Sequence, residues 1–141
     1  MTIQPRTLGI LALVFYPNVQ VMMKNILVAD DDPSLQRLLY YFLRDHYEIQ
    51  TTDSAEDAMR RLHADTVDAL LLDVAFDNGG MDGDEAVVEI RKTHPRLPVI
   101  ALTGFVFEKD RRRLLAAGYS DVVPKPFSQE GVVSVLEKWL S

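Results

Sequence analysis

Five polar residues follow short apolar runs in this chain, and together their types suit phosphate chemistry. Two of them come after the first run and one after each of three later runs: Asp30, Asp31, Asp73, Thr103 and Lys125. In an open parallel sheet the carboxyl ends of the strands meet at one edge, and ligands bind there. If the apolar runs are parallel strands, we expect these five side chains to gather at that edge.

The chemistry of such a cluster follows from its charges. Three carboxylates at one edge repel one another unless a cation lies among them, and a hard divalent ion with oxygen ligands, usually Mg²⁺ beside phosphate, removes that repulsion. A carboxylate such as Asp73 can act as a nucleophile and form an aspartyl phosphate. The negative charge of the transferred group calls for a cation and a hydroxyl donor, which Lys125 and Thr103 supply. Gly104 has no side chain and leaves room for the group to enter.

The elements that would position these residues alternate regularly along the chain. Apolar runs predict strands at residues 26–29, 47–51, 69–72, 98–102 and 121–123. Amphipathic stretches predict helices through residues 33–43, 55–62, 85–92, 108–117 and 132–140. Asp32 and Ser54 are expected to cap the first two helices. The (βα)5 pattern predicts an α/β fold, with a doubly wound parallel five-stranded sheet covered by helices on both faces.

Five motifs carry a resemblance to a known family. They read ILVADDDP at 26–33, LLD at 71–73, MDG at 81–83, ALTG at 101–104 and VPKPF at 123–127. Taken in order, they resemble the receiver domain of two-component response regulators, over about Lys24 to Ser141. The resemblance implies a flavodoxin-like fold with strand order 2-1-3-4-5. It also implies a cis peptide bond between Lys125 and Pro126.

The resemblance further implies the role of each site residue. Asp73 would be the phospho-acceptor. Asp30, Asp31, Asp73 and the backbone carbonyl of Ala75 would hold Mg²⁺. Thr103 and Lys125 would contact the phosphoryl oxygens.

The activity implied is that of a signalling switch and not of an enzyme. A histidine kinase or phosphotransfer protein would donate phosphate from a histidine to Asp73. We expect a stand-alone receiver without an attached output domain, so the signal would pass to an unidentified partner protein. We expect a cytoplasmic protein that does not use a membrane, and a homodimer stays open. Two alternatives remain. One is a phosphate-independent, receiver-like scaffold. The other is a phosphatase of the haloacid-dehalogenase type, which needs a second Asp where Ala75 stands.

Three departures from the family pattern bear on the expected behaviour. Met81 lies eight residues past Asp73, so the intervening loop is about two residues longer than in the family, and it lacks the usual proline. Val122 stands where the family often has an aromatic switch residue. Ala75 and Phe105, which flank the path of attacking water in the family, are both apolar, and this predicts slow self-hydrolysis.

Composition limits the remaining classes of function. The chain has 141 residues, a net charge of −6 and no cysteine, which fits one globular domain and excludes disulfides and thiolate chemistry. An acidic chain is a poor direct partner for nucleic acid, and the arginines at 111–113 are flanked by acidic residues. The three histidines lack metal-ligand spacing and are predicted at the surface.

Residues 1–23 are expected to be an extension of a receiver domain at 24–141. The apolar run at 8–16 is too short to cross a bilayer. Several interpretations of residues 1–23 stay open: a signal peptide, translated upstream sequence with the natural start at Met23, an accessory strand or a functional arm.

Overall fold

The computed structural model describes residues 22–104 and 107–141. Its strands are β1 (Asn25–Ala29), β2 (Glu48–Thr52), β3 (Ala69–Asp73), β4 (Val99–Thr103) and β5 (Asp121–Pro124). Its helices are α2 (Pro33–Leu43), α3 (Ala55–Ala64), α4 (Gly83–Thr93), α5 (Glu108–Ala117) and α6 (Gln129–Leu140). All strand pairs are parallel, in the order β2-β1-β3-β4-β5. The predicted α/β class, doubly wound sheet and strand order are confirmed.

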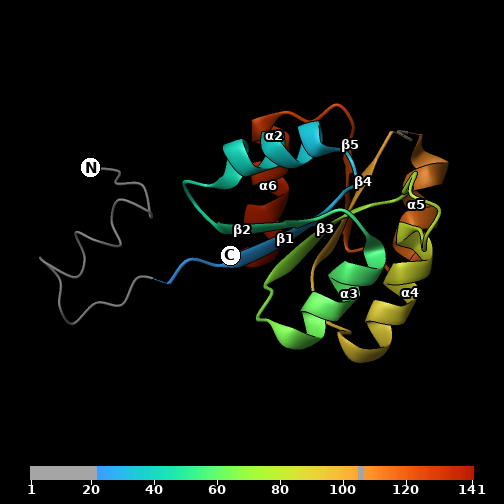
Figure 1. Cartoon of the computed structure of the whole chain (residues 1–141). Coiled ribbons are helices and arrows are strands. Elements are labelled where there is room, and N and C mark those ends of the chain that lie inside the picture. Colours follow the sequence, from blue (N-terminus) through green and yellow to red (C-terminus); the bar gives the residue numbers. More distant parts are fainter. Residues whose placement is uncertain (1–21, 105–106) are drawn as a thin grey trace, which may run out of the picture.

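The sheet lies between two helical layers, with α2 and α6 on one face and α3, α4 and α5 on the other (Figure 1). Strand β3 shows why the chain folds this way, because its side chains alternate between the two faces. Ala69 and Leu71 pack in the core beneath α2 and α6, whereas Leu70 and Leu72 pack in the core beneath α3, α4 and α5. Each buried leucine contributes about 1.5–3 kcal/mol, so both faces of this central strand hold the sheet in place.

Side-chain caps fix where the helices begin. Asp32 Oδ1 accepts a hydrogen bond from Ser34 N and Ser54 Oγ accepts one from Asp57 N, so both predicted caps are confirmed. Helix α4 begins two residues before the predicted start, because Asp82 caps it.

Gly83, the first residue of α4, is required by close packing. A β-carbon at this position would overlap the carbonyl oxygen of Asp73, and Gly83 N donates to Val74 O at 3.0 Å. Gly83 thus closes the neck of the loop that joins β3 to α4, and this holds the loop's two ends together directly beside Asp73.

The arginine run on α5 is held by acidic residues of two other elements. Arg111 lies 3.0 Å from Asp121 on β5, and Arg113 lies 2.7 Å from Asp84 on α4. Asp121 also accepts a hydrogen bond from Trp139 Nε1 at 3.0 Å, and this bond ties the exposed tryptophan of α6 to β5. Two of the three arginines therefore stabilise the fold.

The histidine prediction was only partly right. His46 and His63 are exposed, but His94 is half-buried, and its Nε2 lies 3.2 Å from the carbonyl oxygen of Leu62. Within residues 22–104 and 107–141 no helix has the length and apolar character needed to cross a membrane. The expectations for residues 1–21 and for Phe105 lie outside the described part of the chain.

Candidate functional site

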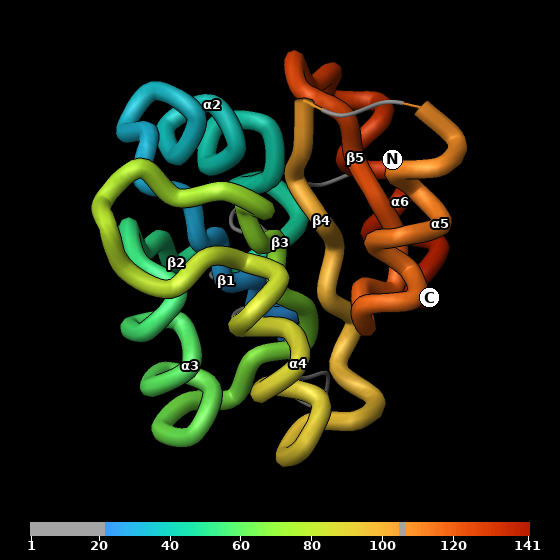
Figure 2. The backbone as a smooth tube through the Cα atoms, turned by 90° about the vertical axis from the view of Figure 1, so that its right-hand side faces the viewer, coloured from blue at the N-terminus to red at the C-terminus, as the bar shows by residue number. Residues whose placement is uncertain are grey.

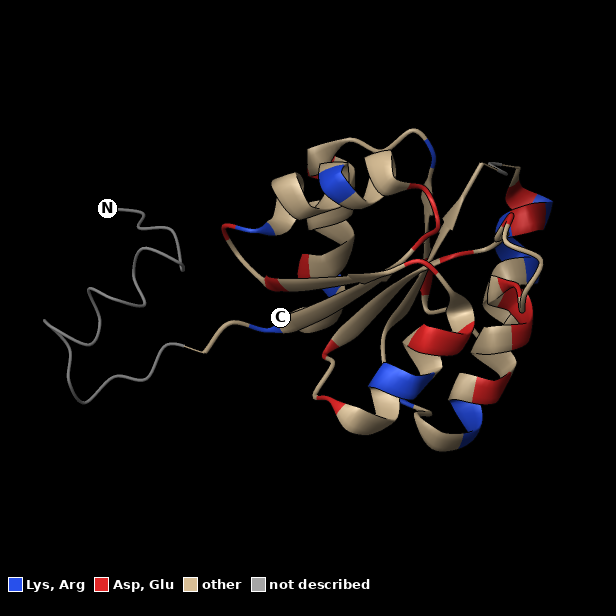
Figure 3. Ribbon diagram, viewed as in Figure 1, with Lys and Arg blue, Asp and Glu red and all other residues tan. Residues whose placement is uncertain are grey.

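The carboxylates predicted to meet at the sheet edge do meet there. Oxygen atoms of Asp30, Asp31 and Asp73 all lie within 4.8 Å of one another. Acidic segments converge where β1 and β3 end (Figure 3). Lys125, which follows β5, places its Nζ 3.1 Å from Asp73 Oδ1 and 3.2 Å from Asp30 Oδ2. The fold thus joins four of the five predicted side chains in one charged cluster.

Lys125 is fixed by its backbone. Its N–H donates to the carbonyl oxygen of Thr103 at 2.7 Å, and the Lys125–Pro126 peptide bond is cis, as predicted. Burial by itself would lower the pKa of the lysine, but the carboxylates of Asp30 and Asp73 outweigh it and raise that pKa. The ammonium group is therefore charged at neutral pH and balances part of the acidic cluster.

Asp73 is buried, with 4% of its surface exposed. Burial raises the pKa of this carboxyl, the charge of Asp30 raises it further, and Lys125 only partly offsets the two. Its Oδ1 accepts hydrogen bonds from Lys125 Nζ at 3.1 Å and from Ala75 N at 3.2 Å. A carboxylate with so little water around it is costly to keep ionised, so a further cation in the cluster would stabilise it.

Asp30 has an oxygen that suits a metal ligand. The residue is fully buried, and its Oδ1 accepts a hydrogen bond from Asp32 N at 2.9 Å. Its Oδ2 has no hydrogen-bond partner of good geometry in the described part of the chain; its charged neighbour is Lys125. Buried carboxylate oxygens without hydrogen bonds are costly. A cluster with only oxygen donors fits a hard cation such as Mg²⁺.

The loop between β3 and α4 reaches across this edge to the neighbouring strand ends (Figure 2). Asp77 N donates to Asp31 Oδ2 at 2.7 Å, and Asn78 Nδ2 donates to the carbonyl oxygen of Asp53 at 3.1 Å. Sequence reasoning missed these contacts, although the two additional residues and the Asn-Gly pair at 78–79 signalled an unusual loop.

The remaining residues singled out from the sequence lie outside the charged cluster of Asp30, Asp31, Asp73 and Lys125. Thr103 is buried at the end of β4, opposite Pro124 in the register of β4 and β5. Ala75 is exposed, and its carbonyl as a metal ligand stays a prediction. Val122 is half-buried and packs against the core beneath α3, α4 and α5.

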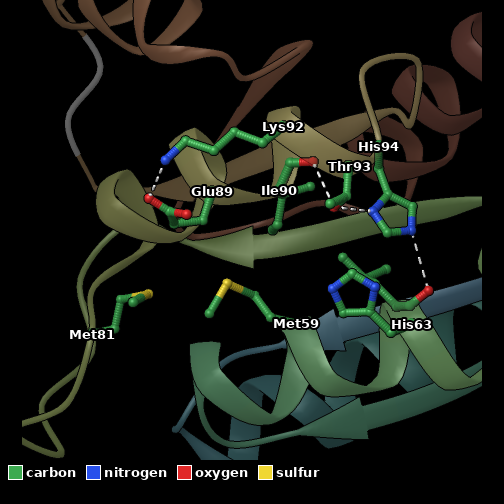
Figure 4. Close-up of a pocket in the computed structure, with 9 residues that line it drawn as sticks. Met59, His63, Met81, Glu89, Ile90, Lys92, Thr93 and His94 are labelled. Atoms are coloured by element: carbon green, nitrogen blue, oxygen red, sulfur yellow. Dashed lines mark hydrogen bonds and ion pairs between the residues drawn. The ribbon is translucent and has the colours of Figure 1, made fainter.

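A groove of about 440 Å³ lies between α3 and α4, away from the carboxylates. Figure 4 shows His63 and His94 facing each other at one end of it, with ring centroids 5.4 Å apart. His94 contacts the Thr93 hydroxyl through Nδ1 at 2.9 Å and Leu62 O through Nε2 at 3.2 Å. Since both ring nitrogens have partners, His94 is a structural residue that ties α4 to α3.

A doubly wound parallel sheet with clustered carboxylates and a lysine at its strand ends belongs to the class of α/β proteins that bind ligands at that edge. The model of one family, the response regulator receiver domain, matches residues 26–137. The chain therefore belongs to the response regulator receiver domain family, and the predicted resemblance is confirmed.

Individual relatives agree with this assignment. The chain is 34% identical over 119 residues to an uncharacterized 14.6 kDa protein of Leptolyngbya boryana, covering 82% of this chain and 88% of that protein. It is 34% identical over 112 residues to the alkaline phosphatase synthesis transcriptional regulatory protein PhoP of Bacillus subtilis, covering 79% of this chain but 46% of PhoP. A crystal structure of a putative response regulator from Chloroflexus aurantiacus matches with a TM-score of 0.78 and 27% identity, covering 84% of this chain and 98% of the other.

Proposed function

We propose that the protein is a phosphorylation switch in which Asp73 accepts a phosphoryl group from a phosphohistidine of a histidine kinase or phosphotransfer protein. Residues 24–141 would form this receiver unit. The observation that carries the proposal is the contact between the buried Asp73 carboxylate and Lys125 Nζ at 3.1 Å, inside a cluster of three carboxylates.

The transfer assigns a role to each oxygen of Asp73. Among the described residues, both hydrogen-bond donors to this carboxylate contact Oδ1. We therefore assign Oδ2 to the attack on phosphorus. The new P–O bond forms as the P–N bond to the donor imidazole breaks, and the ring nitrogen keeps the electron pair. Lys125 and the Thr103 hydroxyl would bind the oxygens of the incoming group and offset their charge.

Asp30, Asp31, Asp73 and the Ala75 carbonyl would hold Mg²⁺. When bound, the ion would neutralise charge on the phosphoryl oxygens and lower the repulsion between the carboxylates. Asp30 Oδ2 supports this assignment, because it is buried and has Lys125 Nζ at 3.2 Å but no hydrogen bond of good geometry among the described residues, so a metal ion would offset the cost of its burial.

Acetyl phosphate with Mg²⁺ tests the proposal without a kinase. We expect intact-mass spectra to show one added phosphoryl group on the wild type and none on Asp73→Asn. Asp65→Asn is the matched control, because Asp65 is an exposed aspartate that follows α3, outside the carboxylate cluster, and it should be labelled like the wild type. Label on Asp73→Asn would overturn the assignment of the acceptor.

The two alternatives give different results. A phosphatase of the haloacid-dehalogenase type would need a proton donor at residue 75, and Ala75 has none; turnover of small phosphate esters would revive that reading. A phosphate-independent scaffold would show neither labelling nor changes in amide chemical shifts when beryllofluoride and Mg²⁺ are added.

A further inference from the structure

The loop after Asp73 contains a segment, residues 77–80, that we call the strap. Its contacts reach two other parts of the sheet edge, the ends of β1 and β2. Asp77 N donates to Asp31 Oδ2 at 2.7 Å. Asn78 Nδ2 donates to the carbonyl oxygen of Asp53 at 3.1 Å, and Asn78 Oδ1 accepts from Gly80 N at 3.0 Å. The strap is therefore anchored after β2 while it holds a carboxylate that follows β1.

Two glycines shape the strap, and one of them lies close to α3. Gly79 has φ = +79°, a conformation that residues with a β-carbon rarely adopt. A β-carbon on Gly80 would lie 2.5 Å from Glu56 Oε2, in the first turn of α3. The backbone conformation therefore favours glycine at residue 79, whereas a side chain at residue 80 would require the exposed Glu56 side chain to move.

We infer that the strap is a positioning element for the metal site, and that the backbone N–H of Asp77 orients the carboxylate of Asp31. The inference rests on the proposed function, because it assumes that Asp31 binds Mg²⁺. Ligating carboxylates are commonly held by hydrogen bonds from neighbouring groups, and removal of such a partner typically weakens metal binding about 10–100-fold. Asp31 is only half-buried, so core packing does not immobilise it as it does Asp30.

The two additional residues of the loop allow the strap to reach the ends of β1 and β2. Gly83 closes the neck of the loop against Val74, which leaves the residues between them free to extend sideways. In the structure they extend over the ends of β1 and β2, where Asp77 meets Asp31. A metal ion that uses the oriented Asp31 would in turn stabilise the strap, since coupling between two sites is reciprocal.

A matched pair of variants at residue 77 tests the inference. Asp77→Pro removes the N–H, whereas Asp77→Ala keeps it, and both lose the same charge. Calorimetric titration with MgCl₂ should give a dissociation constant about tenfold higher for Asp77→Pro than for Asp77→Ala. Asn78→Ala, which releases the anchor at Asp53 but keeps the N–H, should shift the constant in the same direction by a smaller factor. Urea unfolding of each variant checks that the fold is intact.

Hydrogen exchange of the wild-type protein gives a test that needs no variant. We expect the Asp77 amide to exchange more slowly when Mg²⁺ is added. Equal dissociation constants for the two residue-77 variants, or an Asp77 amide that Mg²⁺ leaves unchanged, would overturn the role of the strap. If the wild type binds Mg²⁺ no better than Asp30→Asn does, the metal site itself is refuted, and the proposed function and the strap fall together.

Discussion

Replacing the predicted acceptor should stabilise the fold when Mg²⁺ is absent. In Asp73→Asn the side chain keeps its size and loses its charge. The wild-type carboxylate is buried beside Asp30, and both its burial and that neighbour raise its pKa. The charge of Asp73 is therefore unfavourable in the folded state, whereas in the unfolded chain water solvates the same charge.

The size of the effect follows from the distances. With an effective dielectric constant near 20, two unit charges no more than 4.8 Å apart interact by at least roughly 3.5 kcal/mol, and two about 3.1 Å apart by roughly 5 kcal/mol. Asp73 has two repulsions of the first kind, with Asp30 and Asp31, and one attraction of the second, to Lys125. The repulsions exceed the attraction, and we expect a gain of about 1–2 kcal/mol in the free energy of unfolding.

Urea unfolding followed by far-UV circular dichroism measures this gain. With EDTA present, Asp73→Asn should unfold at higher urea than both the wild type and the exposed-site control Asp65→Asn. With Mg²⁺ at ten times its dissociation constant, the wild type and Asp65→Asn should each gain about 1.4 kcal/mol over their values in EDTA. Asp73→Asn, which lacks one of the proposed ligands, should gain less. A less stable Asp73→Asn in EDTA would refute the reasoning, because the repulsion would then be weaker than the attraction to Lys125.

Two further predictions concern groups outside the carboxylate cluster. Asp121→Asn should lower the free energy of unfolding by about 1–3 kcal/mol at pH 7, because hydrogen bonds to charged partners are lost. Burial raises the pKa of the Asp121 carboxyl, but the hydrogen bonds that it accepts outweigh burial and lower that pKa. The donors are Trp139, Val122 N, Lys138 and Arg111. A carboxyl whose pKa is lowered in the folded state stabilises the fold at pH values above its ordinary pKa near 4, and this stabilisation is lost as the pH falls through the pKa of the folded state. The free energies of unfolding of the wild type and the variant should therefore converge in urea melts taken from pH 6 to pH 3. A difference in these free energies that stays constant over this range would contradict the prediction. Arg91→Lys should destabilise the fold by about 2–3 kcal/mol in thermal or urea unfolding, because a lysine cannot make all the hydrogen bonds of the guanidinium group. Arg91 donates to the carbonyl oxygens of Gly118, His94 and Leu97 and to Ser120 Oγ. An unfolding midpoint equal to that of the wild type would show that the lysine ammonium group makes up for the lost hydrogen bonds.

The order of the elements was predictable because it depends on local patterns. Each predicted strand and helix appears, with ends displaced by one to a few residues. Helix α4 begins two residues before its predicted start, because the Asp82 side chain caps the helix and Gly83 becomes its first residue. A sequence pattern does not reveal this earlier start, since it depends on how closely α4 approaches the end of β3.

For the candidate site, too, some features follow from the sequence and others only from the tertiary structure. By itself the sequence determined which side chains stand at strand ends, and hence that Asp30, Asp31, Asp73 and Lys125 share an edge, because parallel strands place their carboxyl ends together. Only the tertiary structure decided how these groups pair, and that Asp77, far from Asp31 along the chain, donates to it at 2.7 Å. Such contacts depend on the path of a loop and the separation of elements in space, which no local period in the sequence encodes.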